Sequence, residues 1–270
     1  IRILDARRFE EYATMSIPTG TSVPGAELVL GAPILAPDPD TTIIVNCAGR
    51  TRSIIGTQSL INAGLPNRVV ALRNGTIGWT LAGQQLETGQ QRRLPEVDRA
   101  AAAEARGRAR QVAYRAGVRH IDAAALKRLE DDRQRTLYRF DVRQPDAFAA
   151  GHLPGFRNAP GGQLVQETDH FAPARGARIV LADDLGPRAD MSASWLAQMG
   201  WEVYVLDGGL DGPLETGPSD GFPPRGPEGR YKRPYEGTDN PQAAMQAYLD
   251  WEFGLVDQLE RDGTHGFYII

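Results

Sequence analysis

The only cysteine of the 270-residue chain, Cys47, lies in the segment IIVNCAGRTRSIIG, residues 43–56. An apolar run precedes it, and two arginines, Arg50 and Arg52, follow it closely. We expect a buried strand that ends at Asn46 and a helix that begins near Ser53, with the cysteine loop between them. Backbone N–H groups and the helix dipole favour an anion there, and such surroundings lower the pKa of a cysteine. The segment therefore predicts a nucleophilic thiolate that attacks an anion, or a cysteine that holds a sulfur anion.

A buried structural cysteine is the alternative interpretation, because free cysteines are often buried. Such a residue is expected to have apolar neighbours on both sides, whereas the polar, loop-like sequence AGRTR follows Cys47. The sequence therefore favours a reactive cysteine. Arg50 and Arg52 are predicted to lie exposed at the rim of its pocket, where guanidinium groups bind oxyanions and where substitutions cost little stability.

The elements that position this loop occur twice in the chain. ILDARRFEEYATMSIPTGTSVPGAELV begins at Ile3, and RFDVRQPDAFAAGHLPGFRNAPGGQLV begins at Arg139. An offset of 136 residues pairs Asp5 with Asp141, Arg7 with Arg143, Pro18 with Pro154, Pro24 with Pro160, Arg52 with Arg188, and Gly64 with Gly200. The register holds without a gap from residue 3 to residue 64. After a short deletion, ALRNGTIGW (71–79) matches VLDGGLDGP (205–213), so we infer two homologous domains.

Short apolar strands alternate with helix-length segments in each repeat, which predicts an α/β fold with a parallel sheet flanked by helices on both faces. The expected divisions are a first domain over 1–90, a helical linker over 91–117, a second domain over 118–216, and a Gly/Pro-rich segment with a C-terminal helix over 217–270. Asp122 is expected to cap the first helix of the second domain. The first domain lacks that helix, because the chain begins at its first strand.

Composition excludes several classes of protein. The chain is 41% hydrophobic and 24% charged with a net charge of −4, which is typical of a globular protein and does not favour nucleic-acid binding. There is no run of 18 apolar residues, so no membrane span is predicted. The four histidines lack metal-ligand spacing, and no nucleotide-binding glycine motif occurs, so we expect neither metal nor cofactor. One cysteine and no signal peptide indicate a reducing cytoplasm.

The motif CAGRTRS, preceded by a strand and by LDAR, resembles the active loop of the rhodanese (sulfurtransferase) superfamily. ALRNGTIGW in the first repeat, and FDVR, GHLPGFRNAP and VLDGGLDG in the second, resemble other segments of that family. The resemblance covers both repeats, and the chain as a whole is similar to a bacterial tandem-domain rhodanese. It implies two rhodanese-like domains and a thiosulfate sulfurtransferase. The start at Ile1, without Met, is interpreted as part of a longer multi-domain chain.

The resemblance also implies roles for individual residues. Cys47 would accept sulfane sulfur from a small anionic donor such as thiosulfate and become a persulfide. Arg50 and Arg52 would bind the donor, and Arg7 matches an arginine that points toward the pocket in some relatives, or else forms a salt bridge with Asp5. The backbone amides that would hold the persulfide belong to Ala48, Gly49, Arg50, Thr51 and Arg52. An external acceptor, either cyanide or a thiol, is needed because the chain has no second cysteine.

The second repeat places Asp183 where the first has Cys47. A carboxylate cannot carry sulfur, and Asp183 with Asp184 would repel an anionic donor. The second domain is therefore predicted to be catalytically silent. Its role, and any assembly with further rhodanese domains upstream or with a second copy of the chain, stay open.

Two other functions are alternatives. A phosphatase or arsenate reductase of the same fold needs an arginine six residues after the cysteine, where this chain has Ser53, and Asn46 rather than histidine precedes Cys47. A non-enzymatic sulfur-carrier or binding module is the third hypothesis, which the Asp183 loop favours for the second domain. A chain of silent domains alone would lack Cys47 and its arginines.

Overall fold

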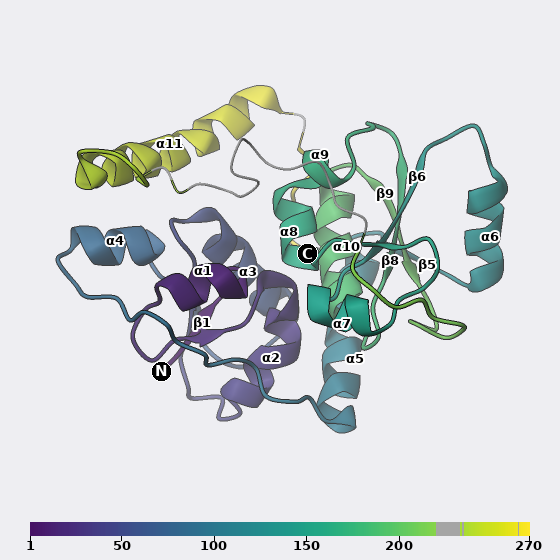
Figure 1. The fold of residues 1–270 in the computed structure, drawn as a ribbon, viewed down its shortest axis with the longest axis horizontal. Helices are drawn as coiled ribbons and strands as arrows, with labels where there is room; N and C mark the ends of the chain where they lie inside the picture. The colour runs from purple at the N-terminus through teal and green to yellow at the C-terminus, as the bar shows by residue number, and fades with distance from the viewer. Residues whose placement is uncertain (220–232, 234, 264) are drawn as a thin grey trace. The chain divides into compact units, whose positions relative to one another are not determined.

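The computed structural model describes residues 1–219, 233, 235–263 and 265–270 (Figure 1). The chain divides into two compact units. Unit 1 contains residues 1–61 and 65–96 together with the C-terminal helix α11, Pro241–Asp262. Unit 2 contains residues 62–64, the described residues from 97 to 219, and residues 265–270. Within the described part of the chain, no helix combines the length and apolar character needed to cross a lipid bilayer.

Unit 1 is built on a parallel four-stranded sheet of order β2-β1-β3-β4. Its strands are β1 (Arg2–Asp5), β2 (Thr21–Ser22), β3 (Ile43–Asn46) and β4 (Val69–Ala71). Its helices, besides α11, are α1 (Phe9–Thr14), η1 (Gly25–Glu27), α2 (Leu28–Leu35), α3 (Thr51–Asn62) and α4 (Gly75–Leu81). Helix α3 lies close against the sheet because Gly56 has no side chain: a Cβ there would come within 2.6 Å of Leu28 and 3.1 Å of Val45.

Unit 2 repeats this sheet and adds one strand, in the parallel order β5-β9-β8-β6-β7. The strands are β5 (Arg119–Ile121), β6 (Leu137–Asp141), β7 (Arg157–Asn158), β8 (Arg178–Ala182) and β9 (Glu202–Leu206). The helices are α5 (Arg99–Arg115), α6 (Ala123–Asp131), α7 (Pro145–Ala150), α8 (Gly161–Gln166), α9 (Thr168–Phe171) and α10 (Pro187–Gln198).

Both faces of the unit 2 sheet are covered by helices. Ile179 and Leu181 of β8 pack into a core with residues of α5, α8 and α10. Val180 alternates with them and packs on the opposite face, where Leu126 and Leu129 of α6 lie. Buried faces on both sides explain why these strands read as continuous apolar runs, and the predicted α/β fold is confirmed.

The two repeats pair their strands in the same register. Arg2 of β1 lies opposite Ile43 of β3, and Tyr138 of β6 lies opposite Ile179 of β8. Both members of the second pair are 136 residues beyond those of the first. The internal repeat predicted from the sequence is therefore a repeat of structure.

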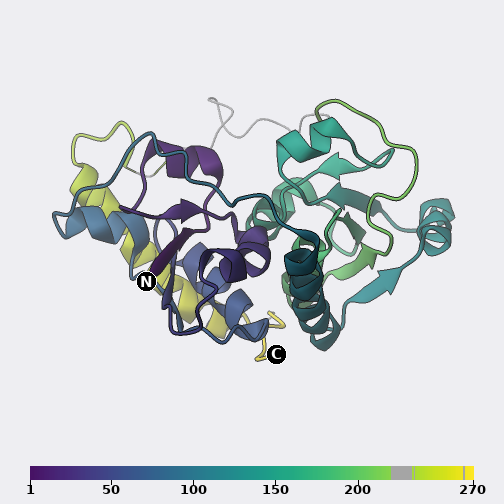
Figure 2. The same cartoon turned by 90° about the horizontal axis from the view of Figure 1, so that it is seen from below.

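The structure places the segments that were predicted between and after the two repeats. Residues 91–117 are predicted to form a helical linker; they contain helix α5, which packs along α10 within unit 2. Asp122 caps α6 as predicted, accepting a hydrogen bond from the Ala125 N–H at 2.7 Å. Much of the Gly/Pro-rich segment after residue 217 lies outside the described residues. The predicted C-terminal helix is α11, which lies beside α4 in both views (Figures 1 and 2).

Candidate functional site

The loop of residues 47–50 joins the carboxyl end of β3 to the N-terminus of α3. Helix α3 begins at Thr51, two residues earlier than predicted. Cys47 opens the loop and is buried, with 2% of its surface exposed. Its Sγ–H donates to Ser53 Oγ at 3.4 Å, and the Ser53 hydroxyl donates to the Arg50 carbonyl at 2.8 Å. The thiol thus lies beside the first turn of the helix, whose N-terminus carries partial positive charge.

Helix α4 holds this loop from the other side. The Thr76 N–H donates to the Cys47 carbonyl and the Ile77 N–H to the Ala48 carbonyl, each at 3.0 Å. Gly75 makes this approach possible: its φ is +55°, and a Cβ there would collide with the Cys47 carbonyl oxygen. The first glycine of ALRNGTIGW, Gly75, is therefore required by close contact with the cysteine loop.

Arg52 does not lie exposed at a rim as predicted. Its guanidinium donates two hydrogen bonds to the Glu11 carboxylate of α1, at 2.8 and 3.0 Å, and only 18% of the Arg52 side chain is exposed. Burial by itself raises the pKa of Glu11, but the charge and hydrogen bonds of Arg52 outweigh it and lower that pKa to about 2. Sequence reasoning missed Glu11. The repeat held a signal, since the second repeat keeps the arginine, as Arg188, but has Ala147 at the position that matches Glu11.

Arg50 is half-buried rather than exposed. Its guanidinium carbon lies 3.6 Å from the ring centroid of Phe253 on α11, the geometry of a cation–π contact. The prediction of exposure is wrong for both arginines for the same reason: another element of unit 1 covers each of them.

Glu252 of α11 also reaches the loop. Thr51 donates to its Oε1 from the hydroxyl at 3.0 Å and from the backbone N–H at 3.5 Å. Glu252 is 6% exposed. Sequence reasoning missed this residue as well, and no local pattern points to it, because it is 201 residues from Thr51.

These surroundings reverse the expected effect on the thiol. Burial raises the pKa of Cys47, although the Arg52 charge and hydrogen bonds with Ser53 act to lower it, and the Glu252 charge raises it further. The expectation that the loop lowers this pKa is therefore wrong. The loop therefore favours the neutral form of the buried Cys47 thiol.

Arg7 lies in a buried clamp. Its Nε and Nη2 donate to the two carboxylate oxygens of Asp5 at 2.9 and 2.7 Å, and Nη2 also donates to the Met15 carbonyl at 2.6 Å. In unit 2, Arg143 makes the same contacts with Asp141 and with the Gly151 carbonyl. A repeat without a cysteine keeps the clamp, which indicates a structural role. Of the two alternatives, the salt bridge is observed, and contact of Arg7 with substrate stays a prediction.

Asp183 occupies the equivalent position in unit 2, directly after β8, and is 3% exposed. Its carboxylate accepts hydrogen bonds from the Arg188 side chain and backbone, both at 2.9 Å. The N–H groups of Leu185 and Ala189 donate to it at 3.4 Å. Burial acts to raise the pKa of Asp183, but the Arg188 charge outweighs it and lowers that pKa. This loop is filled by its own carboxylate and holds no thiol.

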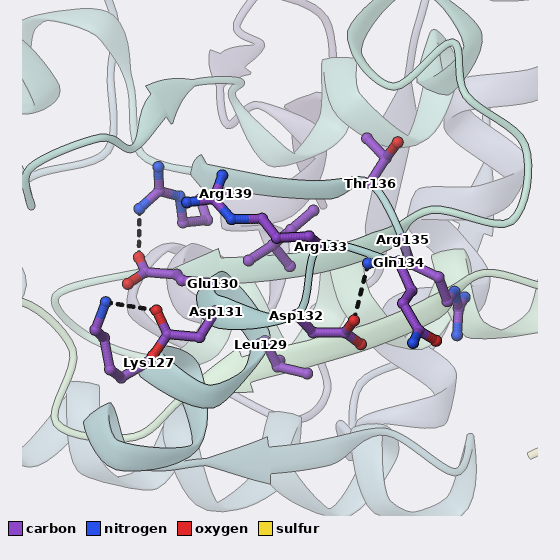
Figure 3. A pocket seen from close by; sticks show the side chains of 11 residues that line it. Lys127, Leu129, Glu130, Asp131, Asp132, Arg133, Gln134, Arg135, Thr136 and Arg139 are labelled. Atoms are coloured by element: carbon purple, nitrogen blue, oxygen red, sulfur yellow. Dashed lines mark hydrogen bonds and ion pairs between the residues drawn. The ribbon is translucent and has the colours of Figure 1, made fainter.

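A charged depression of about 540 Å³ lies elsewhere on unit 2, between α6 and β6 (Figure 3). Its volume would admit a small ligand. However, four of its charged side chains are joined in pairs, Lys127 with Asp131 and Arg139 with Glu130. Neither Cys47 nor Asp183 lines it, so we assign the chemistry to the cysteine loop.

Comparison with known proteins agrees with the repeat and the loop. The family described as "Rhodanese-like domain" matches residues 1–82 and 122–214, which together make up more than half of the chain. The chain belongs to the rhodanese-like family. The family and the two-domain fold predicted from the sequence are thereby confirmed. Each matched range contains the loop that follows the central strand; that loop begins with Cys47 in the first range and with Asp183 in the second.

Three proteins similar to this rhodanese-like chain are named thiosulfate sulfurtransferase. The crystal structure of a thiosulfate sulfurtransferase from Pseudomonas aeruginosa is 46% identical with a TM-score of 0.91, over all of this chain and 73% of that one. Thiosulfate sulfurtransferase GlpE of Pseudoalteromonas translucida (strain TAC 125) is 30% identical over 96 residues, 34% of this chain and 85% of that protein. GlpE of Ectopseudomonas mendocina (strain ymp) is 33% identical over 84 residues, 30% of this chain and 72% of that protein.

Proposed function

We propose that this rhodanese-like chain is a thiosulfate sulfurtransferase that carries sulfur on Cys47. One observation carries the proposal: the only thiol of the chain lies in the loop where β3 ends and α3 begins, beside the N-terminal turn of that helix. The names of its relatives support thiosulfate as the donor. The lone free cysteine supports a reducing compartment, the cytoplasm, as the site of action.

The reaction has two halves. The Cys47 thiol releases its proton to solvent, and the thiolate attacks the outer sulfur of thiosulfate. The sulfur–sulfur bond of thiosulfate breaks, and sulfite leaves with the bonding electron pair. Cys47 then holds a persulfide anion. Cyanide or a thiolate attacks the terminal sulfur in the second half, which forms thiocyanate or a new persulfide and returns the Cys47 thiolate. Ping-pong kinetics are expected from this covalent intermediate.

The loop supplies the stabilisation that a persulfide needs. We expect a sulfur atom added to Cys47 to extend toward the first turn of α3, with the amides of Ala48, Gly49, Arg50 and Arg52 as its donors, joined by that of Thr51 once Thr51 is released from Glu252. Arg52 is held by Glu11 and contributes its charge from a fixed position. We assign Arg50 to binding the oxygens of the donor. Phe253 contacts the face of its guanidinium group, so the N–H groups along the edge can donate to those oxygens.

The loop argues against the phosphatase alternative. Ser53 stands where such an enzyme needs an arginine, and its hydroxyl lies 3.4 Å from the Cys47 sulfur. That hydroxyl fills space that a tetrahedral phosphoryl group would require. We therefore expect negligible hydrolysis of an aryl phosphate by the protein.

Intact mass spectrometry tests the proposal directly. Treatment with thiosulfate is expected to add one sulfur atom to the protein, and cyanide is expected to remove it. Cys47→Ser should keep the fold and gain no sulfur, because the hydroxyl of serine cannot form a persulfide. Sulfur gain by Cys47→Ser, or hydrolysis of an aryl phosphate faster than sulfur transfer, would overturn the assignment.

A further inference from the structure

The Glu252 carboxylate presses against the backbone of the cysteine loop. The Oε1 atom of Glu252 accepts hydrogen bonds from Thr51 and, at 3.4 Å, from the Tyr248 hydroxyl. Its Oε2 is buried and has no hydrogen-bond partner among the described residues. A Cβ on Gly49 would collide with this Oε2. The unpartnered oxygen therefore lies directly against the loop that Cys47 opens.

Helix α11 is anchored so that it keeps Glu252 there. Met245 and Leu249 of α11 pack with Ile77 of α4 in one apolar cluster. One turn of α4 holds the carbonyls of Cys47 and Ala48, so the same helix supports the loop and the helix that covers it. A buried carboxylate oxygen without a donor is costly, and it persists only where packing holds it in place.

An acidic group at this position sits where the loop attracts anions. The N-terminus of α3 carries partial positive charge, and Thr51 N–H already donates to Glu252. Unit 2 shows the same preference independently, because its loop N–H groups donate to the carboxylate of Asp183. Leu185 there replaces Gly49, so no carboxylate can approach the backbone in the way Glu252 does.

We propose that Glu252 is a specificity-determining residue that occupies the anion subsite of the Cys47 loop, so that an anionic donor must displace an internal carboxylate in order to bind. The identity of that donor rests on the function proposed above, whereas the exclusion of anions does not. A donor with negative oxygens meets both the bulk and the charge of Glu252. A neutral reagent of similar size meets the bulk alone.

Alkylation of Cys47 tests this without any sulfur transfer. Iodoacetate and iodoacetamide are similar in size and both consume the thiolate, so the ratio of their rate constants isolates the effect of the reagent's charge. Glu252→Gln should raise the iodoacetate-to-iodoacetamide ratio at least about fivefold, the factor for removing one unit charge about 4 Å from another in water. Glu260→Gln, an exposed carboxylate on the same helix, should leave the ratio unchanged. An unchanged ratio in Glu252→Gln would overturn the proposal.

Two controls keep the result clear. Unfolding would also raise the ratio, so the variant must melt like the wild type and must react with iodoacetamide more slowly than the urea-unfolded chain. If Glu252→Gln fails to fold, Glu252→Met, which keeps the bulk without charge, takes its place. In a sulfur-transfer assay, the folded Glu252 variant, Glu252→Gln or its replacement Glu252→Met, should have a KM for thiosulfate at least about fivefold lower than that of the wild type. Its kcat should be retained. A raised alkylation ratio in a protein that gains no sulfur would support the Glu252 subsite and refute the sulfurtransferase.

Discussion

The Glu11–Arg52 ion pair should stabilise unit 1 in a way that Glu11→Gln removes. The pKa of Glu11 falls from 4.5 to about 2 in the folded chain. At about 1.4 kcal/mol per unit, this shift corresponds to about 3 kcal/mol of stability at neutral pH. Only 17% of the Glu11 side chain is exposed, so solvent screens the pair weakly. Glutamine keeps the shape and can accept one hydrogen bond, so we expect Glu11→Gln to lose about 2–3 kcal/mol.

The pH dependence has a definite sign. Because folding lowers the pKa of Glu11, its contribution is complete above the unfolded value of 4.5 and is lost as the pH falls toward about 2. The free energy of unfolding of the wild type should therefore exceed that of Glu11→Gln most above pH 5. This difference in stability should shrink to nearly nothing near pH 2.

Urea unfolding measured at Cys47 reports on unit 1 alone, since Cys47 is the only thiol. A brief pulse of dithiodipyridine, which reacts with thiols in acid as well as at neutral pH, labels the fraction in which unit 1 is open. Glu10→Gln, the exposed neighbour on α1, is the matched control and should leave the urea midpoint unchanged. The reasoning is refuted if Glu11→Gln has the wild-type midpoint at pH 7, or if its deficit persists undiminished near pH 2.

Two further predictions concern the loops of the two units. Gly75→Ala should destabilise unit 1 by more than Gly83→Ala and slow sulfur transfer, because both glycines have positive φ but only a Cβ at Gly75 would meet the Cys47 carbonyl. Equal melting temperatures and rates for the two variants would contradict this. Asp183→Asn should lower the stability of unit 2 by about 1–3 kcal/mol, because it removes the charge that pairs with Arg188, yet leave sulfur gain per chain unchanged. Melting curves and intact mass check both parts, and a loss of sulfur gain in folded Asp183→Asn would show that unit 2 takes part in transfer.

The sequence by itself determined the fold and the place of the nucleophile. Strand pairing in each unit follows the apolar runs, and the 136-residue offset carries the register of β1 and β3 onto β6 and β8. Cys47 was placed correctly at a strand end because period and turn residues are local signals. The Asp122 cap was predictable for the same reason.

Only the tertiary structure decided what surrounds that nucleophile. Glu11 meets Arg52 across 41 residues of chain, and Glu252 meets Thr51 across 201. No periodic pattern links such positions, so the sequence left both arginines exposed and predicted a lowered pKa for the thiol. The pKa of Cys47 rises instead, because burial and the carboxylate on α11 depend on which segments fold over the loop. Local pattern locates a reactive group, whereas desolvation and charge at that group are properties of the packed chain.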